Sequence, residues 1–268
     1  CNLRKKKFEL ALILHPTNRV RLVTFFARIP KRVGYDRKLG FLLTDKVKHA
    51  KHLGEKHELE YNLDLVRYLG IEPQDTTLFM PIRQESEKWA DELFKKEGIK
   101  EGDKLLALHP GASCPSKIWP HDRFAQTADS LAEKYGFKVI VVAGPKDIKL
   151  AQNTIKHMRQ QAIDLAAKTS ISQLASILKR CSLFISNDSG PVHMASALNT
   201  PVISIFGRNQ AGLSPKRWGP TGKRSRILHK EVGCIECIAH NCVKDFICLK
   251  AITVEDVVKV AEEILTNQ

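Results

Sequence analysis

The sequence has 268 residues with a formal net charge of +14, and 43% of its residues are hydrophobic. This length and composition suffice for one large or two modest domains with apolar cores, which excludes a disordered protein. Its apolar runs are strand-sized and do not approach the ~18 to 20 residues of a membrane helix, so we expect no transmembrane segment.

The first 60 residues are the most basic part of the chain, with 15 Lys and Arg against 6 Asp and Glu, or +9 of the +14. Such a field favours anionic partners. The sequence starts at Cys1 rather than Met and has no apolar secretory segment. We therefore expect the natural N-terminus to lie further upstream.

Residues 1–80 contain one predicted strand at 10–14, a second apolar segment at 22–27 and a helix at 59–69. These elements are too few for a doubly wound domain, so we assign 1–85 to a partial N-terminal lobe. A charged stretch bounded by proline and glycine follows, with a helix at 87–96. We predict that 86–103 is a linker.

From residue 105 onward, short apolar runs alternate with amphipathic stretches. We predict strands at 105–108, 138–143, 163–165, 183–186 and 202–206, and helices at 124–135, after Ser170 and at 254–265. Ser170 suits an N-cap, and Thr253 with Asp256 is close to a capping box. The alternation is typical of a parallel sheet with helical crossovers, so we expect 104–268 to be a complete α/β domain.

Residues 186–195, with the sequence SNDSGPVHMA, form the most informative motif. They follow a predicted buried strand and open a helix, with Gly190 at the turn and Pro191 suited to the first helical position. Such a helix start offers backbone N–H groups and a positive dipole end to a diphosphate. The competing interpretation is that Asp188 and Ser189 only cap the helix, and that His193 is a packing residue.

A second motif follows the first strand of this domain, over residues 109–120. Gly111 permits close backbone approach, Ser113 supplies a hydroxyl, and Lys117 is a mobile positive charge for phosphate. Both motifs lie at the carboxyl ends of strands, where open α/β sheets bind ligands. The alternative is an ordinary strand-to-helix loop with its lysine in water.

Seven cysteines, an odd number, argue against a disulfide scaffold and favour a reducing cytoplasm. Cys234, Cys237, Cys242 and Cys248 lie within 15 residues and could hold zinc or an iron–sulfur cluster. The spacing of the second pair is poor for a metal-binding elbow, so we expect no metal site and interpret the segment as a thiol-rich loop.

Four sequence runs resemble the C-terminal lobe of family 9 glycosyltransferases, the ADP-heptose:lipopolysaccharide heptosyltransferases. They are HPGAS with KIWP, VVAGPKD, SNDSGPVH and PVISIFG, and the likeness covers residues 105–265. The cysteine segment most resembles heptosyltransferase II. This resemblance implies a GT-B fold of two Rossmann-like lobes, with the N-terminal lobe incomplete in this chain because its opening strand and Gly-Asp loop have no counterpart.

The resemblance also implies an activity, the inverting and metal-independent transfer of L-glycero-D-manno-heptose from ADP-heptose to the lipopolysaccharide inner core. It implies no cofactor, and partners limited to the donor and a phosphorylated glycolipid at the cytoplasmic membrane face. The general base would lie upstream of Cys1, so we expect the 268-residue chain by itself to be inactive. Arg19, Arg32 and Arg37 would contact the acceptor, and the donor would contact Gly111, Ala112, Ser113, Lys117, Asp188, Ser189, Gly190, Pro191 and His193.

Two other functions remain open at this point. The first is a catalytically inactive nucleotide-binding lobe, and the second is a basic nucleic-acid-binding protein with a four-cysteine zinc site. The basic start of the chain, residues 1–7, has no interleaved aromatic residues of the kind that stack on bases, which disfavours the second.

Overall fold

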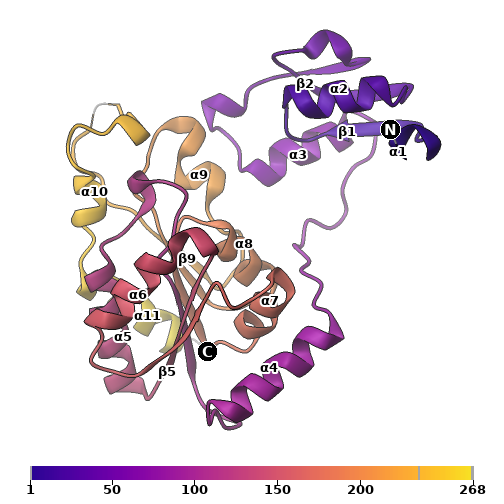
Figure 1. The fold of residues 1–268 in the computed structure, drawn as a ribbon. Helices are drawn as coiled ribbons and strands as arrows, with labels where there is room; N and C mark the ends of the chain where they lie inside the picture. The colour runs from indigo at the N-terminus through magenta and orange to yellow at the C-terminus, as the bar shows by residue number, and fades with distance from the viewer. Residues whose placement is uncertain (1, 235, 267–268) are drawn as a thin grey trace. The chain divides into compact units, whose positions relative to one another are not determined.

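The computed structural model of the protein describes residues 2–234 and 236–266, and the chain folds into two compact units, Cys1–Thr76 and Thr77–Gln268 (Figure 1). The division falls about ten residues before the range 86–103 that we expected to be a linker. None of the described helices is both long and apolar enough to span a membrane.

The first unit is built on a three-stranded parallel sheet in the order β1-β2-β3. Its small core joins Val33 and Tyr35 of β2 to Tyr61 and Leu65 of α3. The strand expected at 10–14 and the helix expected at 59–69 are present, and the apolar segment 22–27 lies in the helix α2. The elements are α1 (Asn2–Lys5), β1 (Leu10–Ile13), α2 (Asn18–Phe26), β2 (Lys31–Asp36), β3 (Asp45–Lys48) and α3 (Glu58–Arg67), with 3₁₀ turns at Gly40–Leu42 and Lys51–Leu53.

The second unit contains a six-stranded sheet, all parallel, in the order β6-β5-β4-β7-β8-β9. Its five predicted strands are present, and β9 at the edge is an addition. The strands are β4 (Leu105–His109), β5 (Lys138–Ala143), β6 (Ala162–Ala166), β7 (Leu183–Asn187), β8 (Val202–Ile205) and β9 (Ser225–Leu228). The chain adds strands on one side of β4 and then returns to add β7 on the other. The order therefore reverses between β4 and β7, and such a switch point is where open α/β sheets bind ligands.

Helices cover both faces of this sheet, with α5, α6 and α11 on one side and α7 and α8 on the other (Figure 1). Each face of the sheet has its own apolar core, and alternate residues of β4 point into one or the other. Leu106 and Leu108 pack in the first core, with α5, α6 and α11, and Leu105 and Ala107 pack in the second, with α7 and α8. The helices are α4 (Gln84–Lys96), α5 (His121–Tyr135), α6 (Ile148–His157), α7 (Ile171–Lys179), α8 (Gly190–Ala197), α9 (Pro215–Trp218), α10 (Ile247–Lys250) and α11 (Val254–Thr266), with short 3₁₀ turns such as η3 (Pro115–Lys117), η4 (Pro145–Asp147) and η6 (Ala239–Asn241).

Helix α4 belongs to the second unit and packs on α7. Its Ala90 is fully buried in the second core, and Arg180 forms ion pairs of 2.7 Å with both Glu87 and Asp91. The start of α7 has the capping box that Ser170 indicated, completed by Gln173. The hydrogen bonds expected between Thr253 and Asp256 are also confirmed, with nitrogen-to-oxygen distances of 2.8 and 3.2 Å.

Candidate active site at the carboxyl edge of the second sheet

The loops that follow β4 and β7 are joined directly to each other. Asn187, the last residue of β7, donates from Nδ2 to the Pro110 carbonyl at 2.8 Å and accepts from the Trp119 amide at 3.0 Å. Trp119 is fully buried, and its indole donates to the Ile252 carbonyl at 3.0 Å. One buried amide side chain thus fixes the two motifs at the switch point relative to each other.

Three charged side chains meet at this edge. Asp188 is only 5% exposed, and its Oδ2 lies 2.9 Å from Lys117 Nζ and 2.9 Å from Arg208 Nη2. Lys117 comes from the β4 loop, Asp188 from the β7 loop and Arg208 from the segment after β8. Two positive charges on one carboxylate leave the cluster with a net charge of +1, which suits an anionic ligand.

The start of α8 borders this cluster. Ser189 is its N-cap residue, but its hydroxyl does not cap the helix and instead lies 3.0 Å from Ser186 Oγ and 3.2 Å from His109 Nδ1. The interpretation of Ser189 as a simple cap is therefore wrong. Burial lowers the pKa of His109 to about 4, so the imidazole is neutral at pH 7 and one ring nitrogen can accept a hydrogen bond.

The remaining predicted donor residues lie in the same two loops. Gly111 is buried against Asp147, and an added Cβ would lie 2.4 Å from Asp147 Oδ2. Close approach is thus a requirement at Gly111, whereas a Cβ on Gly190 would meet nothing within 4 Å. Ala112, Pro191 and His193 are half-buried, and Ser113 is exposed at the loop surface.

Sequence reasoning missed Arg208 and the role of His109. Arg208 is 6% exposed and directly follows Gly207, where the quoted run PVISIFG stops. A basic residue just after a buried strand beside β7 was the available signal. Burial also raises the pKa of Asp147, the carboxyl group beside Gly111.

Four arginines of the first unit fall into two groups. Arg19 and Arg37 are exposed. Arg32 donates to the carbonyls of Leu42, at 2.8 Å, and Ile29, and Arg21 is fully buried with Nη2 on the Tyr35 carbonyl. Arg21 therefore lacks the exposed guanidinium that a surface contact needs.

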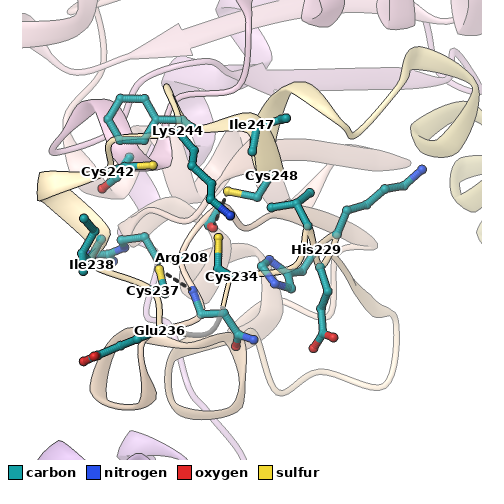
Figure 2. A pocket seen from close by; sticks show the side chains of 18 of the residues that line it. Arg208, His229, Cys234, Glu236, Cys237, Ile238, Cys242, Lys244, Ile247 and Cys248 are labelled. Carbon is teal, nitrogen blue, oxygen red and sulfur yellow. Dashed lines mark hydrogen bonds between the residues drawn. The ribbon is translucent and has the colours of Figure 1, made fainter.

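The four cysteines named from the sequence line a cavity of about 450 Å³ together with Arg208 and His229 (Figure 2). In the described ranges, 2–234 and 236–266, no three His, Cys, Asp or Glu side chains are placed to hold a metal ion. The cavity adjoins the charged cluster through Ser116 and Arg208, which line it.

Comparison with known proteins identifies the family of this chain. The sequence model described as "Glycosyltransferase family 9 (heptosyltransferase)" matches residues 1–247. The chain belongs to glycosyltransferase family 9. The resemblance seen in the sequence is therefore confirmed, and with it membership of a family of glycosyltransferase enzymes.

Among individual relatives of this family 9 chain, lipooligosaccharide heptosyltransferase 2 of Haemophilus ducreyi is 27% identical over 246 residues, covering 84% of the chain. The chain spans 66% of that relative's length.

Solved structures agree on the fold. A family 9 glycosyltransferase from Veillonella parvula superposes with a TM-score of 0.84 at 23% identity, covering all of this chain and 78% of the other. The ADP-heptose LPS heptosyltransferase II of E. coli gives 0.80 at 22% identity, covering 99% and 79%. The α/β fold of GT-B type is confirmed.

Proposed function

We propose that this protein transfers L-glycero-D-manno-heptose from ADP-heptose to the inner core of lipopolysaccharide. The observation that carries the proposal is the cluster of Lys117, Arg208 and Asp188 at the switch point, beside the start of α8. The relatives are lipopolysaccharide and lipooligosaccharide heptosyltransferases, and the name of the E. coli structure specifies ADP-heptose.

The donor diphosphate would bind over this cluster. Lys117 Nζ and the Arg208 guanidinium donate to phosphate oxygens, and the N-terminus of α8 adds the positive end of its dipole. Asp188 holds both cations in place before the ligand arrives, so little reorganisation is needed. Gly111, Ala112 and Ser113 form the adjoining wall, and Gly190, Pro191 and His193 face the sugar and phosphate from α8.

The chemistry follows from where charge develops. When the bond between the anomeric carbon and the phosphate oxygen breaks, negative charge grows on the leaving ADP. Fixed cations beside that oxygen stabilise the transition state electrostatically, and so the proposed transfer is metal-independent. Attack by the acceptor hydroxyl on the opposite face of the sugar inverts the anomeric centre, and a general base takes the hydroxyl proton.

The acceptor would meet the basic first unit. Arg19 and Arg37 are exposed and free to move toward phosphate or carboxylate groups, whereas Arg32 already donates to backbone carbonyls and would contribute mainly charge. Guanidinium groups pair bidentately with such anions. A lipopolysaccharide acceptor places this reaction at the cytoplasmic face of the inner membrane, with the protein peripheral to it.

Two measurements test the proposal together. Calorimetric titration should show ADP binding, with UDP weaker. Because the general base is expected upstream of Cys1, the coupled assay uses the protein extended to its natural N-terminus. It should detect ADP released from ADP-heptose only when a heptose-accepting lipopolysaccharide core is present. ADP binding without transfer would support a nucleotide-binding protein instead. Failure to bind ADP would remove the donor site altogether.

A further inference from the structure

The pair with Asp188 holds only one end of the Arg208 guanidinium. Arg208 is 6% exposed, and its Nη2 pairs with Asp188. Its Nε is buried and has no hydrogen-bond partner among the described residues. The direction of this side chain therefore depends on how its backbone is held as well as on Asp188.

Two cysteines hold that backbone from either side. Cys248 donates from Sγ to the Gly207 carbonyl at 2.8 Å, and the Asn209 amide donates to Cys237 Sγ at 3.4 Å (Figure 2). The residues before and after Arg208 are thus bound to opposite ends of one segment, residues 236–248, called here the cysteine loop. Burial, with Cys237 and Cys242 nearby, raises the pKa of the Cys248 thiol, so it keeps the proton that it donates.

The cysteine loop also contacts the segment that carries Lys117, the other cation of the charged cluster. His240 Nδ1 lies 3.4 Å from Ser116 Oγ, and Ser116 immediately precedes Lys117. Gly207 is enclosed between Ser116 and the residue that follows the cysteine loop, because an added Cβ would lie 2.6 Å from Leu249 Cγ and 2.7 Å from the Ser116 carbonyl. The neighbours of both cations are therefore fixed by this part of the chain.

The backbone of the cysteine loop is itself strained. Ala239, Asp245 and Phe246 have φ angles of +47°, +46° and +51°, the left-handed region that residues with a Cβ rarely adopt. Such conformations persist when surrounding contacts over-determine them, and they cluster at functional sites. The cysteines of this loop were singled out in the sequence, and the charged cluster of Lys117, Asp188 and Arg208 does not by itself give them a function.

We propose that Cys237 and Cys248 are positioning residues that hold Arg208, through Gly207 and Asn209, in the orientation that binds the donor diphosphate. The inference rests on the proposed donor site. It assigns the cysteine loop a role in donor affinity through hydrogen bonding by its thiols, without a disulfide or a bound metal.

Titrations of cysteine variants with ADP test this role. Cys248→Ala should raise the dissociation constant for ADP about 2- to 10-fold, the equivalent of one net hydrogen bond. Cys248→Ser keeps a donor and should recover most of the affinity. Cys237→Ala should weaken binding similarly. Cys242→Ala is the matched control, since this cysteine lines the same cavity but makes no hydrogen bond to 207–209 among the described residues, and its affinity should stay unchanged.

A double-mutant cycle separates positioning from general loosening of the fold. If Cys248 acts through Arg208, then Cys248→Ala should have no further effect on ADP affinity in an Arg208→Ala background. Equal factors in both backgrounds would overturn the proposal, as would wild-type affinity of Cys248→Ala. Urea midpoints for each variant ensure that only folded protein is titrated.

The Arg208→Ala variant alone distinguishes the two levels of inference. If it binds ADP as the parent does, the proposed donor site fails and the positioning role fails with it. If it binds more weakly while Cys248→Ala and Cys237→Ala do not, the donor site stands and only the positioning role is wrong.

Discussion

Replacing Lys117 by alanine tests the electrostatic design of the donor site. The cluster of Lys117, Arg208 and Asp188 has a net charge of +1, and both cations lie 2.9 Å from the same carboxylate oxygen. Lys117→Ala leaves Asp188 paired with Arg208 and brings the net charge to zero. The diphosphate then loses one charge-assisted hydrogen bond, typically about 1.5 to 3 kcal/mol, or roughly 10- to 150-fold in the dissociation constant for ADP.

The assay is calorimetric titration of ADP at fixed ionic strength, because screening weakens such contacts. Lys134→Ala is the control. Lys134 is 59% exposed and pairs with Glu262 of α11, so it takes no part in the charged cluster. Lys117→Arg keeps the charge and should bind better than Lys117→Ala. Unchanged ADP affinity in Lys117→Ala would refute the placement of the diphosphate over this cluster.

Three further outcomes follow from the structure. Since His109 has a folded pKa of about 4, below its unfolded value of about 6.5, its contribution to stability is complete above pH 6.5 and falls as the pH drops toward 4. His109→Gln should remove up to about 3 kcal/mol of that pH dependence in urea unfolding, and an unaltered pH profile would count against it. Gly111→Ala should drive a Cβ into Asp147, cost about 1 to 3 kcal/mol and weaken ADP binding; wild-type ADP affinity would show that the loop relaxes. In the protein extended to its natural N-terminus, removing charge at Arg19 and Arg37 should raise the acceptor KM and lower its salt sensitivity with donor affinity unchanged. A loss of donor affinity with unchanged acceptor kinetics would show that these arginines contact the donor instead.

The sequence allowed the second unit to be predicted because burial on both faces makes its central strands continuous apolar runs. Residues 105–108 and 183–186 read as strands by themselves, and the motif loops follow from them. The strands β2 and β3 were missed since their sequences, KRVGYD and DKVK, are short and charged. Only the pairing of β2 with β1 and of β3 with β2 makes them strands.

Contacts between residues far apart in the chain were the second feature that could not be predicted from the sequence. Both Lys117 and Asp188 were candidate ligands of the donor, but nothing in the spacing of 71 positions indicates that they bind each other. Arg208 was absent from the prediction for the same reason, because it joins the cluster through the neighbouring strand β8. Hydrogen bonds of thiols to backbone groups, as at Cys237 and Cys248, have no sequence signature at all.

A crystal structure of the protein with ADP is the most direct measurement of the donor site. The account predicts a diphosphate oxygen within hydrogen-bonding distance, about 2.7 to 2.9 Å, of Lys117 Nζ or the Arg208 guanidinium, with the phosphates at the N-terminus of α8. ADP bound in the cysteine-lined cavity, or elsewhere with the pairing of Lys117, Asp188 and Arg208 undisturbed, would contradict it.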